Sequence, residues 1–117
     1  MKLLVSGSRA FSATERVAVF LDAILNTRVP IELVVTGDCE GPDKVAQMWA
    51  RAHNIPVEVV AADWIGDEDK AGTKRNGAMI EKTTQAVIYW DGESINTLDL
   101  ICRAKKRKDY PVEVYIA

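Results

Sequence analysis

The sequence is poor in the residues that build metal and disulfide sites. It has one histidine, His53, and two cysteines, Cys39 and Cys102, in a chain of 117 residues. No Cys-x-x-Cys pair is present, so neither a zinc site nor a disulfide framework is expected. We therefore expect no metal and no cofactor, and a reducing cytoplasmic location, which is the host cytoplasm if the protein is viral.

The chain also lacks long hydrophobic runs and an excess of positive charge. The apolar start, Met1–Gly7, is too short for a signal peptide, and no stretch approaches the length of a membrane span, so no membrane partner is expected. A net charge of -2 and a pI of about 5.4 argue against general nucleic-acid binding. With 48% hydrophobic and 27% charged residues, the composition predicts one folded domain over residues 1–117.

Short apolar runs alternate with amphipathic stretches along the whole chain. The pattern predicts five strands, at residues 2–6, 31–36, 56–61, 85–90 and 111–116. It predicts four helices between them: after a capping box at Ser12–Glu15, from Pro42, from Arg75 to about Lys82, and from Ile95 to Lys108. We therefore expect a single Rossmann-like three-layer α/β sandwich, with a five-stranded, mainly parallel sheet of order 3-2-1-4-5.

The large apolar residues of each helix indicate which face it buries. The faces expected to be buried are Val17, Phe20, Leu21, Ile24 and Leu25 in the first helix, Val45, Met48, Trp49 and Ala52 in the second, and Leu98, Ile101 and Cys102 in the last.

Unusual polar loops follow the first four predicted strands. Ligands of such sheets bind outside the carboxyl ends of the strands, so these loops predict one composite site. The loops are Gly7–Arg9, Gly37–Asp43, Lys70–Met79 and Asp91–Thr97.

Several side chains in these loops suit a phosphorylated small molecule. Arg9 and Arg75 offer planar forks for phosphate, although either could be an exposed turn or helix arginine. The two glycines of Gly37–Asp43 precede a helix N-terminus, yet the acidic residues there would repel an anion. Asp43 could accept ribose hydroxyls or simply cap its helix.

Two further features are open to more than one interpretation. Trp64 and Trp90 could stack on a base or serve only in packing. The basic run Arg103–Lys108 could contact nucleic acid, but cations at a helix C-terminus also complement the helix dipole. Because this run should lie at the opposite end of the sheet from the loops, we interpret it as a solvated helix end.

Taken in order, five motifs resemble the SLOG superfamily, and within it the small YspA-like branch. The motifs are Gly7-Ser8-Arg9, Gly37-x-x-x-Gly41-x-Asp43, Ala62-Asp63-Trp64, Gly72-x-x-Arg75-Asn76-x-x-Met79 and Asp91-Gly92-x-Ser94-x-x-Thr97. The superfamily is Rossmann-like and includes LOG-type phosphoribohydrolases, the DNA-processing protein DprA, and domains that bind nucleotide-derived signals such as ADP-ribose.

The resemblance implies a nucleotide pocket and some of its residues. It implies that Gly7, Ser8, Arg9, Gly37, Asp43, Arg75, Asn76, Gly92, Ser94 and Thr97 line the pocket, and we add Asp63, Trp64, Lys74 and Asp91 as ligand-binding candidates. Arg75 matches the catalytic arginine of LOG-type enzymes, and Thr97 matches the threonine of their signature.

Three positions depart from the pattern of LOG-type enzymes. Leu100 stands where their signature has its final glutamate, Asn96 replaces a glycine before the threonine, and Asp38 replaces the second glycine after strand two. Cleavage of an N-glycosidic bond needs a carboxylate, so its loss favours binding over turnover. If the protein is an enzyme, Arg75 and Asp99 are the catalytic candidates, and Asp91 or Asp43 could also replace the missing glutamate.

Three functions remain open from the sequence. The first is binding of an ADP-ribose-like or related signalling nucleotide, as a sensor or sequestering protein, for example in phage-host conflict. The second is LOG-like hydrolysis of a nucleotide, and the third is DprA-like binding of single-stranded DNA through Lys105–Lys108. We also expect a homodimer or larger homo-oligomer, as in LOG-type relatives.

Overall fold

A computed structural model describes residues 1–62 and 71–116 of the chain. The strands are β1 (Lys2–Gly7), β2 (Leu33–Gly37), β3 (Val57–Val60), β4 (Gln85–Trp90) and β5 (Val112–Ile116). The helices are α1 (Glu15–Asn26), α2 (Pro42–Ala52), α3 (Ala71–Glu81) and α4 (Ile95–Lys106). The number, type and order of the predicted elements are thus confirmed.

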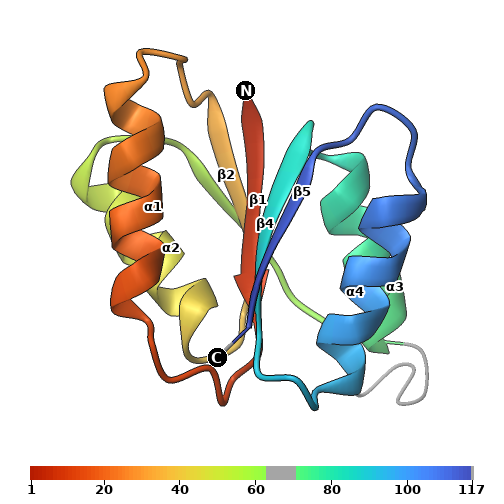
Figure 1. Cartoon of the computed structure of the whole chain (residues 1–117). Coiled ribbons are helices and arrows are strands. Elements are labelled where there is room, and N and C mark those ends of the chain that lie inside the picture. Colours follow the sequence, from red (N-terminus) through yellow and green to blue (C-terminus); the bar gives the residue numbers. More distant parts are fainter. Residues whose placement is uncertain (63–70, 117) are drawn as a thin grey trace.

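The strands form one parallel sheet between two layers of helices. Its order is β3-β2-β1-β4-β5, and every neighbouring pair is parallel. Helices α1 and α2 cover one face and α3 and α4 the other (Figure 1). The sheet is therefore the predicted Rossmann-like sandwich, with all strands pointing the same way where we expected a mainly parallel arrangement.

The side-chain pattern of β1 explains why the sheet is buried on both faces. Leu3 and Val5 belong to a cluster under α1 and α2, whereas Leu4 belongs to a second cluster under α3 and α4. Leu4 aligns with Val35 of β2 and with Ala86 of β4, so the three apolar side chains form a continuous row across the sheet. Alternating apolar residues in central strands thus supply both cores.

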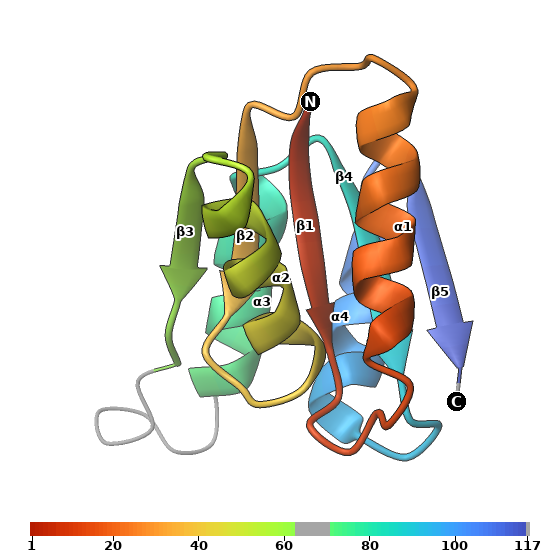
Figure 2. The same cartoon turned by 90° about the vertical axis from the view of Figure 1, so that its left-hand side faces the viewer.

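Because all strands are parallel, their carboxyl ends meet at one edge of the sheet (Figures 1 and 2). The loops after β1, β2 and β4 gather there, as do the N-terminal ends of all four helices. This arrangement brings the predicted binding loops together, as the expected topology requires.

The predicted capping box of the first helix is wrong. The helix begins at Glu15, and Thr14 is the cap residue, without a side-chain hydrogen bond. The amides of Arg16 and Val17 instead donate to the carbonyls of Ala13 and Thr14. A tight backbone turn therefore satisfies the first helical donors, and no Ser12 cap is needed.

The expected buried faces are only partly right. In α1, Val17 and Leu21 are buried, Phe20 and Ile24 are half-buried, and Leu25 is exposed. In α2, Trp49 is buried and Val45 is half-buried, but Met48 is 69% exposed and Ala52 is exposed. In α4, Ile101 is buried but Leu98 and Cys102 are exposed.

Mostly small and polar residues occupy the buried positions that the prediction missed. The side of α2 that meets the sheet carries Pro42, Asp43, Ala46, Gln47 and Ala50, and that of α4 carries Thr97, Leu100 and Ala104. Alanine lets a helix lie close to a sheet, and the buried polar residues are held by hydrogen bonds described below. Hydrophobicity alone therefore predicted the buried faces of α2 and α4 only in part.

Helix α3 begins earlier than predicted. It starts at Ala71, so Arg75 lies in its second turn and does not open the helix. No helix among the described residues combines the length and apolarity that crossing a membrane would require.

Candidate functional site

A polar crevice of about 180 Å³ lies at the carboxyl ends of the strands. Six of the predicted site residues line it: Gly7, Ser8, Arg9, Arg75, Ser94 and Thr97. Cys39 and Asn96 complete the lining. The structure thus brings residues from four separate segments of the chain into one site.

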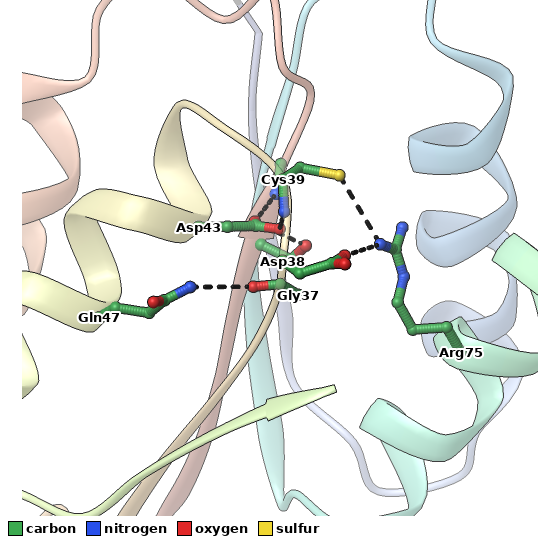
Figure 3. A network of polar contacts seen from close by, with 8 residues as sticks. Gly37, Asp38, Cys39, Asp43, Gln47 and Arg75 are labelled. Carbon is green, nitrogen blue, oxygen red and sulfur yellow. Dashed lines mark hydrogen bonds and ion pairs between the residues drawn. The ribbon is translucent and has the colours of Figure 1, made fainter. Parts of the chain in front are cut away.

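Arg75 is the most buried charge of this crevice. Its side chain is only 7% exposed, and its Nη1 lies 3.1 Å from Oδ1 of Asp38, whose side chain is 40% exposed. Nη1 also lies 3.7 Å from the Cys39 sulfur, and these contacts are drawn in Figure 3. The buried Nε of Arg75 has no hydrogen-bond partner among the described residues, so the guanidinium keeps a free donor.

Asp43 lies beneath the crevice and ties two loops together. Its Oδ1 accepts hydrogen bonds from Ser6 Oγ at 3.0 Å and from the Gly7 amide at 3.1 Å. Its Oδ2 accepts from the Cys39 amide at 3.3 Å. Burial raises the pKa of Asp43 to about 6, against the opposing effect of these hydrogen bonds and of Arg75.

The position of Asp43 bears on the two roles considered for it. The cap residue of α2 is Gly41, without a side-chain cap, and the Asp43 side chain is 1% exposed and not part of the crevice lining. Asp43 therefore does not cap its helix, and it lies outside the lining of the crevice. It links the end of β1 to the loop that follows β2.

Gly37 is required by the close approach of two charged groups. A Cβ atom at this position would lie 2.6 Å from Oδ2 of Asp43 and 3.3 Å from Nη1 of Arg75. Its carbonyl accepts a hydrogen bond from Gln47 Nε2 at 3.2 Å (Figure 3). Only glycine leaves space for the carboxylate and the guanidinium to share this corner.

A cluster of hydroxyl groups forms the opposite wall, at the N-terminus of α4. Ser8 Oγ donates to Thr97 Oγ1 at 3.0 Å, and Thr97 Oγ1 donates to Ser94 Oγ at 3.2 Å. Ser94 is the cap residue of α4 and accepts from the Thr97 amide. A helix N-terminus next to hydroxyls and an arginine suits an anionic group.

Asp91 shapes the loop before this helix. Its Oδ1 accepts from the amides of Glu93 at 2.9 Å and Ser94 at 2.8 Å. These hydrogen bonds, Ser94 first, lower the pKa of Asp91. Gly92 is exposed in the same turn with a φ of 84°, so both residues support the loop without lining the crevice.

Asn76 and Asp99 join α3 to α4 outside the crevice lining. Asn76 Nδ2 donates to the Asn96 carbonyl at 2.9 Å and to Oδ2 of Asp99 at 3.1 Å. Arg103 Nε donates to the same Asp99 oxygen at 2.8 Å. Leu100, where the related signature has its glutamate, is 2% exposed within the core.

Several other candidates lie away from the crevice or outside the described residues. Lys74 is exposed on α3, and Trp90 Nε1 donates to the Ser94 carbonyl at 3.1 Å, which gives Trp90 a role in holding the loop. Asp63 and Trp64 lie outside the described residues, as does Lys70.

Two residues that line the crevice, and the residue that pairs with Arg75, were not predicted as ligand contacts. Cys39 had been considered only as a possible metal or disulfide residue, Asn96 only as a departure from the family pattern, and Asp38 as one of the acidic residues that would repel an anion. A signal was present for Asn96, because it lies between Ser94 and Thr97 in the same loop. No sequence signal predicted that Asp38 pairs with Arg75, 37 positions away.

The basic run at the C-terminal end of α4 lies at the other end of the sheet, as expected (Figure 1). There Arg107 Nη1 donates to the carbonyls of Ile80 and Thr83, the latter at 2.7 Å. The guanidinium carbon lies 4.6 Å from the centre of the Tyr110 ring. One cation of this run therefore stabilises the end of α3.

A second hollow on the surface contains none of the predicted site residues. An apolar groove of about 400 Å³ runs between α1 and the β4–β5 edge and is lined by Val19, Phe20 and Tyr115, among others. In the described parts of the chain, no three histidine, cysteine or carboxylate side chains gather as a metal site would require.

Comparison with known proteins places the chain in a family. The model of the YspA, cpYpsA-related SLOG family matches residues 1–65, which is more than half of the chain. The chain is also 31% identical over 114 residues to the Gene 61 protein of Mycobacterium phage D29, covering 90% of this chain and 89% of that protein. No solved structure shows significant similarity. The protein therefore belongs to the YspA, cpYpsA-related SLOG family.

Proposed function

We propose that the protein binds an ADP-ribose-like or related signalling nucleotide at the crevice, as a sensor or sequestering protein. The main support for this proposal is the environment of Arg75. A guanidinium that is almost fully buried, with an unpartnered Nε, in a polar crevice, suits a phosphate group of a ligand.

The lining also supports binding over hydrolysis. The described lining residues include two arginines and several hydroxyl and amide groups, but no carboxylate. Asp99 is held by Asn76 and Arg103, and Asp43 is buried beneath the crevice. An N-glycosidase would need one of these carboxylates to reach the substrate.

The size of the crevice indicates which part of the ligand it holds. Ligand pockets usually enclose about 300 to 1,000 Å³, whereas this crevice encloses about 180 Å³. It suits a phosphate and its ribose, and the base would extend beyond the rim. A second copy of the chain could cover the base, so a homodimer or larger homo-oligomer is part of the proposal, and a clean monomer in light scattering with nucleotide bound would contradict that part.

Native mass spectrometry with AMP, NAD and ADP-ribose tests the proposal directly. We expect at least one intact nucleotide to remain bound. Loss of the base would show a glycosidase, and no binding by any of the three would refute the proposal.

Calorimetry on two variants would assign the site. We expect Arg75→Ala to weaken nucleotide binding about 100-fold, because a hydrogen-bonded charge pair is worth about 1.5–3 kcal/mol. Arg103→Ala is the matched control, since it removes an exposed arginine that lies outside the crevice. Equal losses in both variants would place the ligand elsewhere.

The similarity to a phage protein supports a role in phage-host conflict. In that setting the protein would act by keeping a signalling nucleotide from its receptor. Co-purification of an intact nucleotide from infected cells would support this role, and its release by Arg75→Ala would link it to the crevice.

A further inference from the structure

A carboxylate that does not itself line the crevice lies beside the arginine that would bind a ligand phosphate. Asp38 Oδ1 lies 3.1 Å from Nη1 of Arg75, so the guanidinium is already paired with one carboxylate. The Asp38 side chain is 40% exposed, and it remains close to any anion that approaches Arg75.

The positive charges near this point are few. Arg9 is exposed and is the other cation among the described lining residues. Asp43 lies on the buried side of Gly37, and its carboxylate attracts the same guanidinium. A ligand phosphate therefore meets one arginine that two carboxylates already share.

The phosphate groups of nucleotides differ in the negative charge that they carry. A phosphate monoester carries a charge of about -1.5 to -2 at pH 7, because its second pKa is about 6. A phosphodiester or a bridging pyrophosphate has no second acidic proton of this kind, and each such phosphorus carries one negative charge. Repulsion by Asp38 should therefore be roughly twice as large for a monoester. Attraction by Arg75 and Arg9 is larger for a monoester too, so the effect of Asp38 is to reduce the advantage that the extra charge gives a monoester.

We propose that Asp38 shifts the preference of the crevice towards nucleotides whose phosphate is a diester or a bridging pyrophosphate and away from those with a terminal phosphate monoester. This proposal rests on the proposed nucleotide binding and specifies which class of nucleotide binds. Asp38 acts as a fixed repulsive group, which is a common way to reject a close competitor of the correct ligand.

Two ligands that differ by one methyl group isolate this effect. AMP is a monoester, and the methyl ester of AMP has the same base and ribose with a diester phosphate. In calorimetry at pH 7.5 we expect Asp38→Asn, which keeps the shape of the side chain, to raise the affinity for AMP about tenfold relative to that for the methyl ester. The reason is that AMP carries about one more negative charge, which Asp38 repels at short range.

Glu40→Gln is the matched control, because Glu40 is an exposed carboxylate of the same loop and is not the one that pairs with Arg75. It should leave the ratio of the two affinities unchanged. An unchanged ratio in Asp38→Asn would refute the role of Asp38 and leave nucleotide binding intact. Failure of both ligands and of ADP-ribose to bind at all would refute the proposed function as well.

Discussion

Arg75 lies near the first turns of α3 and Arg107 contacts its last turn, and the two arginines differ in what they contact. Arg107 donates to the carbonyls of Ile80 and Thr83 and lies over the Tyr110 ring. Arg75 contacts one half-exposed carboxylate and a thiol, and its buried Nε has no partner among the described residues. The contacts of Arg107 with backbone carbonyls stabilise the fold, whereas the unsatisfied buried donor of Arg75, next to the crevice, makes Arg75 the candidate for a ligand.

The difference extends to the surroundings of the two side chains. Arg107 satisfies carbonyls that a helix C-terminus leaves without partners, and its charge complements the helix dipole. Arg75 is surrounded by a buried carboxylate, a glycine with no room for a side chain, and a helix N-terminus. The densest basic run of the sequence is thus structural in part, while an isolated arginine marks the site.

The largest expected effect concerns pH at the crevice end. Burial raises the pKa of Asp43 to about 6, so the folded protein holds this proton more tightly than the unfolded chain, in which the pKa is about 4. The resulting stability is fully present below about pH 4 and is lost as the pH rises through 6. A shift of about two pKa units corresponds to about 3 kcal/mol of the free energy of unfolding.

Carbon-13 NMR of the side-chain carboxyl group measures this pKa directly, and urea denaturation between pH 4 and 7 measures its effect on stability. Asp91 of the neighbouring loop should titrate below its usual range, because backbone amides stabilise its charged form. An Asp43 carboxyl carbon that titrates near 4 would contradict the expectation. Asp43→Asn should remove this part of the pH dependence.

A smaller effect is expected at the other end of the sheet. Arg107→Ala removes two hydrogen bonds to carbonyls and the contact with Tyr110. We expect the free energy of unfolding to fall by about 2 kcal/mol, with nucleotide affinity unchanged. Chemical denaturation and calorimetry on the same variant would test both parts, and a loss of ligand binding would break the distinction between the two arginines.

The smallest effect is expected for the exposed lysines of the basic run. Replacing both Lys105 and Lys106 by alanine should change the free energy of unfolding by less than about 1 kcal/mol and leave nucleotide affinity unchanged. Gel-shift experiments with single-stranded DNA at low salt should show no complex with either protein. A salt-sensitive complex that the double variant loses would return nucleic-acid binding to this end of the sheet.

The predictions that rested on periodicity over whole segments were the accurate ones. The strand order and the gathering of the loops at one edge follow from alternating apolar and amphipathic segments, which leave few other topologies. Predictions about individual helix faces were weaker. Met48 and Leu98 are exposed although they are large and apolar, because small residues on other faces allow α2 and α4 to lie closer to the sheet.

The sequence by itself determined the fold class, the family, and the set of loops that could meet a ligand. Only the tertiary structure decided which residues of those loops face the crevice. It placed Asp43 beneath the site, moved Asn76 and Asp99 into the joint between two helices, and paired Arg75 with Asp38. The physical reason is that local patterns specify each element separately, whereas the direction of a side chain at the edge of a sheet depends on how neighbouring elements pack against one another.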